Sequence, residues 1–177
     1  MHNPETPRLL FRRFTPDDLH ALAAIRADAD VMKYTTGRPE SVQEVQVWLD
    51  ERMAHWTDHG FGRWALIDKA TSALAGWCGL SYLEHTTEVE IGYGLAKDYW
   101  GTGLATQAAA ATMNYGFEQL HLPRIVAVAY PENAASRRVL EKLGMKYVKN
   151  GQFFGVEMVY YEIRQEEYRQ RTQSAGK

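Results

Sequence analysis

Residues 100–106 carry two glycines, Gly101 and Gly103, at a point where the sequence changes its pattern. The preceding residues 88–95 read as a β-strand, and the alanine-rich run that follows, to about residue 120, favours an α-helix. Two glycines at such a passage leave backbone N–H groups uncovered at the positive end of the helix dipole. This feature predicts a strand–loop–helix unit whose loop binds an anion, in particular a phosphate-bearing ligand.

Three interpretations compete for a glycine pair before a helix. A dinucleotide fingerprint needs a third small residue and an acidic residue about 20 positions later. Here Thr106 stands at the third position, and residues 122–126 contain no acid and enter another strand. A nucleotide P-loop needs a Gly-Lys-Ser/Thr triplet, which this chain lacks. The third interpretation is a tight turn in which glycine only satisfies the backbone geometry.

The surrounding residues favour a diphosphate site, because residues 98–103 resemble the Gln/Arg-x-x-Gly-x-Gly/Ala pyrophosphate loop of the GNAT acetyltransferases. Residues 90–95 and 99–106 are similar to the ribosomal-protein N-acetyltransferase branch of that family, the RimJ/RimL-like proteins. Residues 131–136 and 143–145 resemble the family's later motif at the expected distance. The resemblance covers about residues 8–163 and implies acetyl-CoA as the co-substrate. With the chain length, it predicts one acetyltransferase domain over residues 1–177.

The chain as a whole predicts the element order β-α-α-β-β-β-α-β-α-β-β. A helix between the fourth and fifth strands implies a parallel crossover inside an otherwise antiparallel sheet, so the fold class is α/β with a mixed sheet. The resemblance implies the GNAT fold, in which these two strands splay apart and acetyl-CoA enters the gap. We expect a closing hairpin that turns at Asn150-Gly151, a loose tail over residues 1–7 and a frayed tail from about Arg164.

Composition narrows the range of functions. The net charge is −2 and no run of lysine or arginine occurs, so neither nucleic acid nor a membrane surface is an expected partner. The single cysteine, Cys78, excludes an internal disulfide, and the histidines lack metal-ligand spacing, so no metal is expected. Without a signal peptide or an apolar run of 18 residues, the sequence predicts a cytoplasmic protein. It leaves open whether the protein is a monomer or a homodimer.

Glu90 is the candidate general base. Acetyl transfer from a thioester needs a base for the amine, a hydrogen-bond donor for the oxyanion and an acid for the departing thiolate. Glu90 lies on the strand before the glycine loop, and alternation turns its neighbours Val89 and Ile91 to the other face. Glu88 is the alternative base on the same face, and an exposed, non-catalytic Glu90 is the competing interpretation.

Ser136 is the candidate acid, because it stands in the first turn of the helix that Asn133 is expected to cap. There the helix dipole favours a nearby thiolate. Many GNAT enzymes use a tyrosine seven residues after this asparagine, but the position is Leu140 here, and the RimL-like resemblance implies serine instead. A first-turn serine that only bonds the backbone is the competing interpretation. Asn133 is expected to touch the pantetheine arm, although capping alone would explain it.

The resemblance also implies a set of cofactor-binding residues. The backbone at Tyr93 and Leu95 should pair with pantetheine like an added strand. The backbone N–H groups expected to hold the diphosphate belong to the loop and helix start: Trp100, Gly101, Thr102, Gly103, Leu104 and Ala105. Asp98 departs from the family pattern of Gln or Arg. Five aromatic residues could line an acceptor pocket but are more readily explained as core: Tyr34, Trp48, Trp56, Phe61 and Tyr82.

These features together predict an N-acetyltransferase in which a primary amine attacks acetyl-CoA directly. The acceptor is either a protein N-terminal α-amine or a small amine such as a polyamine, an amino acid or an antibiotic. The mildly acidic composition, with a sequence pI near 6.3, suits a cationic acceptor only weakly. A non-catalytic acyl-CoA-binding module is the alternative function.

Overall fold

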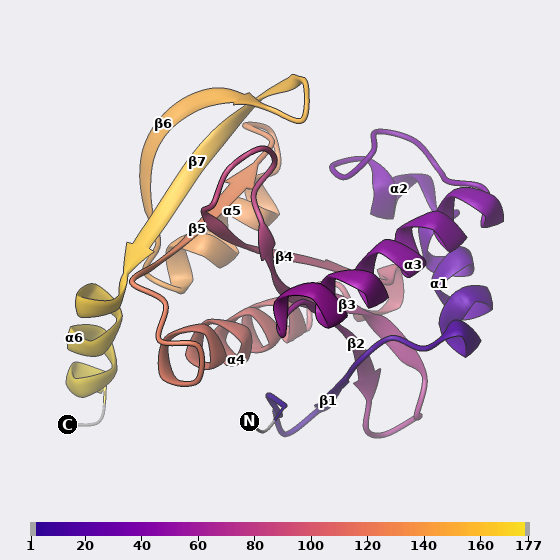
Figure 1. Cartoon of the computed structure of the whole chain (residues 1–177), viewed down its shortest axis with the longest axis horizontal. Helices are drawn as coiled ribbons and strands as arrows, with labels where there is room; N and C mark the ends of the chain where they lie inside the picture. The colour runs from indigo at the N-terminus through magenta and orange to yellow at the C-terminus, as the bar shows by residue number, and fades with distance from the viewer. Residues whose placement is uncertain (1–2, 176–177) are drawn as a thin grey trace.

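The computed structural model describes residues 3–175, and its centre is a seven-stranded sheet in the order β1-β2-β3-β4-β5-β7-β6 (Figure 1). The strands are β1 (Leu9–Arg12), β2 (Arg63–Asp68), β3 (Leu74–Tyr82), β4 (Val89–Leu95), β5 (Arg124–Ala129), β6 (Lys146–Phe153) and β7 (Val156–Arg164). Neighbouring strands are antiparallel except β4 and β5, which are parallel. The predicted mixed sheet with one parallel crossover is confirmed.

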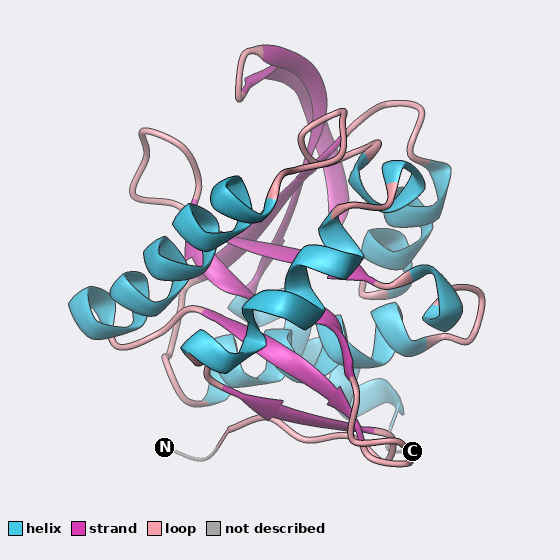
Figure 2. Ribbon diagram, turned by 90° about the vertical axis from the view of Figure 1, so that its right-hand side faces the viewer, coloured by secondary structure: helices cyan, strands magenta, loops and turns pink. Residues whose placement is uncertain are grey.

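Helices cover both faces of this sheet (Figure 2). They are α1 (Leu19–Arg26), α2 (Ala29–Met32), α3 (Val42–His59), α4 (Leu104–Glu118), α5 (Ala134–Lys142) and α6 (Gln165–Ala175), with single 3-10 turns at η1 (Pro16–Asp18) and η2 (Lys97–Tyr99). Helix α4 is the crossover between β4 and β5. The short helix α2 was not predicted, and it begins at Asp28, whose side chain accepts hydrogen bonds from two backbone N–H groups. No helix within residues 3–175 is long and apolar enough to cross a membrane.

Alternation along the strands places the two larger apolar cores of residues 3–175 on opposite faces of the sheet. One lies between the sheet and α4, where Trp64 and Ile91 pack with Met113. The other lies between the sheet and helices α1 and α3, where Trp77 packs with Leu49. Cys78 belongs to the α4 side and is fully buried, and burial raises the pKa of its thiol to about 12. An uncharged, buried thiol is inert.

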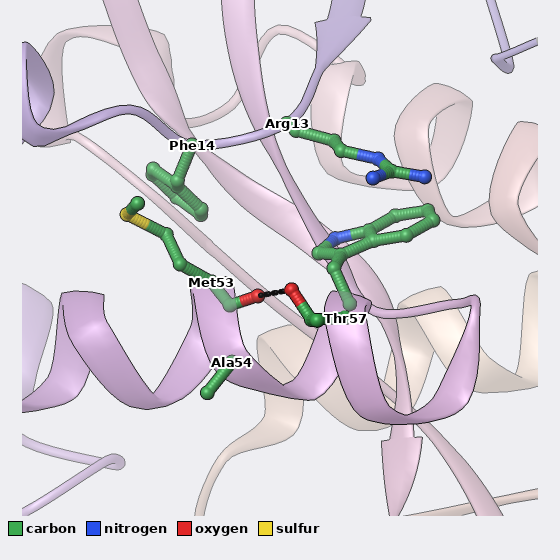
Figure 3. Close-up of a pocket in the computed structure, with 6 residues that line it drawn as sticks. Arg13, Phe14, Met53, Ala54 and Thr57 are labelled. Carbon is green, nitrogen blue, oxygen red and sulfur yellow. Dashed lines mark hydrogen bonds between the residues drawn. The ribbon is translucent and has the colours of Figure 1, made fainter.

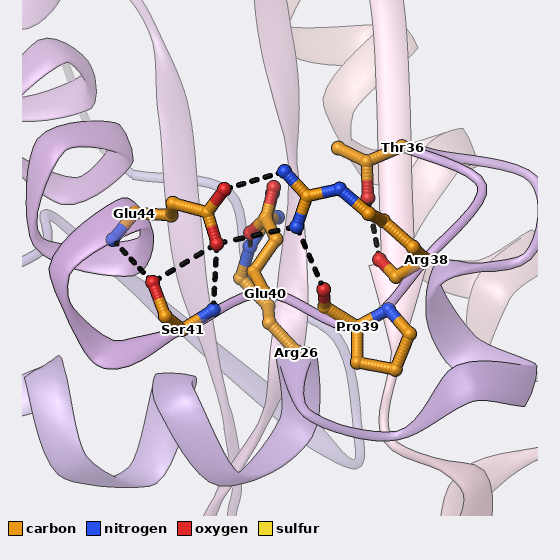
Figure 4. A network of polar contacts seen from close by, with 7 residues as sticks. All are labelled: Arg26, Thr36, Arg38, Pro39, Glu40, Ser41 and Glu44. Atoms are coloured by element: carbon orange, nitrogen blue, oxygen red, sulfur yellow. Dashed lines mark hydrogen bonds and ion pairs between the residues drawn. The ribbon is translucent and has the colours of Figure 1, made fainter.

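Helix α3 begins with a capping box. Ser41 Oγ accepts the Glu44 N–H at 3.3 Å, and Glu44 Oε2 accepts the Ser41 N–H at 2.8 Å (Figure 4). Arg38 binds the same carboxylate, which lowers the pKa of Glu44 to about 2. The helix ends at Gly60, whose φ of +74° is the left-handed conformation that stops a helix. These contacts fix α3 over the sheet, where it carries Arg52 and His55.

Strands β4 and β5 pair at one position only, Glu90 with Val126, and then diverge. The splay implied by the resemblance is therefore present. It opens the edge of β4 beyond Glu90, towards Leu95 and the glycine loop. This edge is where the candidate site lies.

The predicted hairpin turn at Asn150-Gly151 is wrong. Asn150 pairs with Val159 and Gly151 with Met158, so β6 continues to Phe153. The turn comes at residues 154 and 155, both with positive φ, where Gly155 adopts +77° without strain. An Asn-Gly pair inside a strand is tolerated because β6 is an edge strand, largely exposed.

The two predicted tails are also ordered where the structure describes them. Residues from 165 form helix α6, because Tyr168 stacks on Phe117 at 4.7 Å and Arg171 donates to the Lys142 carbonyl at 2.6 Å. At the other end, Thr6 Oγ1 accepts the Leu9 N–H at 3.0 Å and folds residues 3–7 back on β1. Residues 1 and 2 of the predicted N-terminal tail lie outside the described residues. Charged sequence suggested fraying, but a few long-range contacts hold these segments.

Candidate active site

The glycine loop presents unused backbone donors. Gly101 and Gly103 have φ of +71° and +79°, and a Cβ at either position would meet nothing within 4 Å. Glycine is therefore needed for the left-handed backbone and not for space. Gly103 is the N-cap of α4 and brings no side-chain cap. Among residues 3–175, the N–H groups of residues 101–105 have no hydrogen-bond acceptor, so they form the predicted anion-binding feature.

Trp100 was expected to offer its backbone N–H to the diphosphate, but this group is already engaged. Its backbone N–H already donates to the Lys97 carbonyl at 3.0 Å, so it is not an open donor. Its indole Nε1 donates to the Leu95 carbonyl at 2.9 Å and ties the loop to the end of β4. A cation that the sequence analysis missed lies beside the loop: Arg8 Nη1 donates to the Thr102 carbonyl at 3.3 Å. Arg8 comes 94 residues before its partner, and no local pattern could have revealed it.

The edge of β4 at Tyr93 and Leu95 is open. The Gly94 carbonyl lies against Gly76 of β3, because a Cβ on Gly76 would stand 2.1 Å from it. Strand alternation then turns the backbone groups of Tyr93 and Leu95 to the opposite edge, towards the splay. This edge could pair with an extended ligand, although the Leu95 carbonyl is partly engaged by Trp100.

Glu90 lies on the face of β4 that is turned to α3, and Val89 and Ile91 pack on the α4 side, as alternation predicted. Arg63 Nη2 donates to Glu90 Oε1 at 3.0 Å, and the Ser81 hydroxyl donates to the same oxygen at 3.3 Å. Glu90 is only 6% exposed, and this burial raises its pKa while Arg63 and Ser81 oppose the rise. A carboxylate with a raised pKa is a suitable general base near neutral pH.

Glu88, the alternative base, is occupied elsewhere. It forms an ion pair with Arg124 and accepts the Tyr160 hydroxyl at 3.0 Å. Arg124 also binds Glu162 of β7 at 3.2 Å. These contacts tie β5 and β7 to the segment before β4, so the geometry favours Glu90 as the base.

The Ser136 side chain contacts the hydroxyl of Tyr93, a residue for which the sequence predicted only a backbone role. The Ser136 N–H donates to Asn133 Oδ1 at 3.1 Å, so Asn133 caps α5. The Tyr93 hydroxyl lies 2.9 Å from Ser136 Oγ and donates to the Ser136 carbonyl at 3.2 Å. Burial raises the pKa of Tyr93, which keeps the phenol protonated. Leu140, at the position of the family tyrosine, is 1% exposed in the core.

Alternation along β4 thus divides the chemical groups between the two faces of one strand. Glu90 faces α3, and Tyr93 with Ser136 lies on the side of α4 and α5. The splay opens past both, and the loop amides follow at the end of β4. A thioester held in the gap would have a base on one side and a hydroxyl pair on the other.

The five aromatic candidates are dispersed. Trp56 is buried and donates to the Arg63 carbonyl at 2.9 Å, and the Trp48 ring packs at a tilt against Trp77, with 5.6 Å between the ring centres. Phe61 and Tyr82 form a cluster at the end of α3, and Tyr34 contacts Tyr130 after β5 at 5.7 Å. Their sites range from core to surface, so they do not line one pocket.

One described cavity lies elsewhere. It measures about 310 Å³ and is lined by residues of α3 and of the segment after β1: Arg13, Phe14, Met53, Ala54, Trp56 and Thr57 (Figure 3). The Arg13 guanidinium stands 4.5 Å above the Trp56 ring. None of the candidate catalytic residues lines this cavity, so we do not place the reaction there.

His55 gives a testable pH dependence. Its ring lies 4.5 Å from His59, and burial, with the charges of His59, Arg52 and Arg63, lowers its pKa to about 4; only Asp58 opposes. The unfolded chain, with a histidine pKa near 6.5, takes up the proton first. Stability should therefore fall as the pH drops from about 6.5 towards 4.

We expect the variant His55→Gln to lose less stability over this range than the wild type. The melting temperature at several pH values between 7 and 4 measures it. His121→Gln is the matched control and should follow the wild type. Equal losses in wild type and His55→Gln would show that His55 does not carry this dependence.

Three features define a CoA-dependent acyltransferase. The mixed sheet splays at its parallel pair, an anion loop begins the crossover helix, and a carboxylate lies opposite a hydroxyl pair. The acetyltransferase (GNAT) domain model matches residues 8–146. The chain belongs to the GNAT family and is an N-acetyltransferase of it.

Relatives and a solved structure agree with this assignment. The uncharacterized protein YkkB of Bacillus subtilis is 34% identical over 137 residues, 76% of this chain and 79% of YkkB. The uncharacterized N-acetyltransferase YoaA of the same organism is 31% identical over 144 residues, 80% of this chain and 81% of YoaA. A GNAT-family acetyltransferase from Bacillus anthracis superposes with a TM-score of 0.80 at 28% identity, covering 92% of this chain and 98% of that one.

Acetyl-CoA is the acyl donor that the family uses, and the loop donors fit its diphosphate. Within residues 3–175, no group of three or more His, Cys, Asp or Glu side chains is arranged to hold a metal ion. The chemical groups beside the splay are the Glu90 carboxylate and the Ser136 and Tyr93 hydroxyls.

Proposed function

We propose that this protein transfers the acetyl group of acetyl-CoA to a primary amine by direct attack. One observation carries the proposal: buried Glu90 and the Ser136–Tyr93 pair lie on opposite sides of the strand that borders the splay. The amine nitrogen bonds the thioester carbon, and its proton passes to Glu90, directly or through a water. The carbon–sulfur bond then breaks, and the Ser136 hydroxyl gives its proton to the sulfur.

Tyr93 supports the acid step. Its hydroxyl is hydrogen-bonded to Ser136 Oγ, so it stabilises the charge that develops on that oxygen before solvent returns a proton. Glu90 releases its proton to solvent, which closes the cycle with free CoA and an N-acetylated product. No covalent bond to the protein is formed.

The co-substrate is held by the end of β4 and the loop. The proposed diphosphate donors are the N–H groups of Gly101, Thr102, Gly103, Leu104 and Ala105, and Arg8 is a nearby cation. Trp100 contributes by tying the loop to Leu95. The open backbone edge at Tyr93 and Leu95 would pair with pantetheine, and Asn133 orients the first turn of α5 beside it.

Gly103→Ala tests the loop. Alanine costs about 1–2 kcal/mol in the left-handed conformation, and its Cβ meets nothing. If the loop relaxes to escape this strain, the Kd for CoA should rise by about 5- to 30-fold, measured by calorimetry. Gly155→Ala, at the hairpin tip with φ of +77° and equally open space, is the matched control. It should lose similar stability and keep the affinity, and an equal change in both would place the diphosphate elsewhere.

The test of the function itself is a panel of amines and N-terminal peptides with acetyl-CoA. Transfer predicts release of CoA together with a product heavier by one acetyl group. The panel should contain free amino acids, their amides, a polyamine and peptides with a free N-terminus. A protein that acetyl-CoA stabilises thermally, but that releases no CoA above hydrolysis with any acceptor, would be the non-catalytic acyl-CoA-binding module instead.

A further inference from the structure

Three arginines converge on the face of the sheet that carries Glu90. They come from different elements: Arg26 ends α1, Arg52 lies in α3 and Arg63 begins β2. The three lie close together, because Arg52 interacts electrostatically with Arg63 and Arg26, and also with Glu90. Burial and the two neighbouring guanidinium groups lower the pKa of Arg52. We call these three residues the arginine cluster.

The carboxylates near the cluster leave guanidinium nitrogens unused. Arg26 is 1% exposed and donates through Nε to Glu40 at 2.5 Å, but its Nη1 is buried without a partner (Figure 4). Arg52 binds the exposed Glu51 at 3.1 Å, and within residues 3–175 its buried Nε has no acceptor. Arg63 Nε is likewise buried without a partner. Buried donors without acceptors are costly. The side chains of Arg52 and Arg63 remain 23% and 16% exposed, so these two guanidinium groups can still take an acceptor from outside.

Aromatic rings hold part of the cluster in place. The Arg26 guanidinium lies 4.4 Å from the Trp48 ring and 5.0 Å from the Trp77 ring. The Arg52 guanidinium lies 5.4 Å from the same Trp48 ring. A guanidinium stacked on aromatic rings keeps its in-plane N–H groups available for a carboxylate.

Arg63 reaches β4 from β2 and contacts it at Gly92. A Cβ on Gly92 would stand 2.7 Å from Arg63 Nη2 and 3.0 Å from its Cζ, so the guanidinium rests flat on this glycine. Gly92 is the next residue after Glu90 on the same face of β4. Glycine at position 92 thus makes room for a cation next to the candidate base.

The diphosphate of CoA is not the missing acceptor. Its proposed donors follow η2 at the N-terminus of α4, and α4 packs on the opposite face of the sheet. From Gly92 to Leu95 the strand advances about 10 Å at ~3.4 Å per residue, and five more residues separate Leu95 from Gly101. The arginine cluster therefore lies beside Glu90, on the face of the sheet opposite the proposed diphosphate donors.

We infer that the acceptor is a primary amine that also carries a carboxylate, as a free amino acid does. This inference rests on the proposed N-acetyltransfer. The carboxylate would take hydrogen bonds from Arg52 and Arg63, and charge-assisted pairs of this kind are strong and geometrically selective. By drawing Arg63 towards itself, the carboxylate also weakens the hold of Arg63 on Glu90, so the base is released when the correct acceptor binds. A polyamine, which the acidic composition weakly favoured, would instead meet repulsion here.

The experiment compares acceptors that differ only in the carboxylate. Leucine is set against leucinamide and isoamylamine, and phenylalanine against phenethylamine, with CoA release and product mass as readouts. We expect kcat/KM to be about 10- to 100-fold higher for the amino acid, the range of one to two charge-assisted hydrogen bonds. A leucyl dipeptide moves the carboxylate away from the amine and should be a poor acceptor. Spermidine is the cationic comparison and should be the poorest.

Arg52→Met and Arg52→Lys locate the effect. Arg52→Met should lower kcat/KM for leucine more than for isoamylamine and so lose the preference for leucine, whereas Arg52→Lys should retain part of that preference. Arg169→Met, on the exposed surface of α6, is the matched control. Melting temperature and CoA affinity report whether each variant is folded.

The outcomes separate the two proposals. Equal kcat/KM for leucine and isoamylamine in the wild type, or an unchanged preference in folded Arg52→Met, would overturn the inference and leave N-acetyltransfer intact. Absence of CoA release with every amine would overturn the proposed function itself. If Arg52→Met does not fold, the wild-type comparison still decides.

Discussion

The variant Glu90→Gln should lower kcat by about 100- to 10,000-fold, the usual contribution of a general base. Glutamine keeps the size of the side chain and can still bond Arg63 and Ser81, so the fold should persist. It cannot accept the amine proton. Because Glu90 lies on the face of the sheet opposite α4 and its N-terminal loop, the Kd for CoA should change little. Steady-state turnover and calorimetric titration with CoA measure the two quantities.

Glu88→Gln tests the alternative base. Its contacts with Arg124 and Tyr160 are structural, so we expect a loss of stability with a much smaller loss of turnover. Glu166→Gln, on the exposed face of α6, controls for a carboxylate removed from the surface. A larger loss of turnover in Glu88→Gln than in Glu90→Gln would reverse the assignment.

The variant Glu90→Gln should also change the pH dependence of the reaction. Burial raises the pKa of Glu90, and only its charged form accepts a proton. The profile of kcat/KM should therefore rise with pH on an acid limb whose apparent pKa lies above the ordinary glutamate value of about 4.3. Glu90→Gln should lack this limb. An unchanged limb in the variant would assign it to another group.

Local sequence patterns predicted the parts of the site that are built locally. Alternation around Glu90 fixed which face it takes, because Val89 and Ile91 need an apolar core. The glycine pair fixed the loop, since only residues 101 and 103 must adopt positive φ. Asn133 fixed the start of α5 and with it the place of Ser136. Each of these depends on residues a few positions apart.

What could not be predicted depends on contacts between distant residues. Arg63 reaches Glu90 across 27 positions because β2, β3 and β4 pair in one particular register. The arginine cluster needs α1 and α3 to pack over that sheet. The hairpin turn was misplaced because Asn150-Gly151 is a strong turn signal that strand pairing overrode. Tyr93 was assigned a role only for its backbone, since nothing local shows that its hydroxyl meets α5.

Ser136→Ala should lower kcat by about 100-fold or more, because the departing thiolate then lacks a proton donor. The backbone N–H of residue 136 still donates to Asn133, so the cap and the affinity for CoA should remain. Ser174→Ala, on α6, is the matched control. Single-turnover rates with saturating acetyl-CoA measure the chemical step and avoid confusion with product release.

Tyr93→Phe separates the hydroxyl pair from the serine alone. Phenylalanine keeps the packed ring and removes only the oxygen 2.9 Å from Ser136 Oγ, so we expect a smaller loss of kcat, about 10-fold, with KM nearly unchanged. An acyl donor with selenium in place of sulfur releases a weaker base, and both variants should then approach the wild-type rate. A loss that stays equally large with that donor would mean that Ser136 positions the substrate and does not act as the acid. The position of the family tyrosine, occupied here by Leu140, would then have no functional substitute on α5, and the thiolate would leave unprotonated.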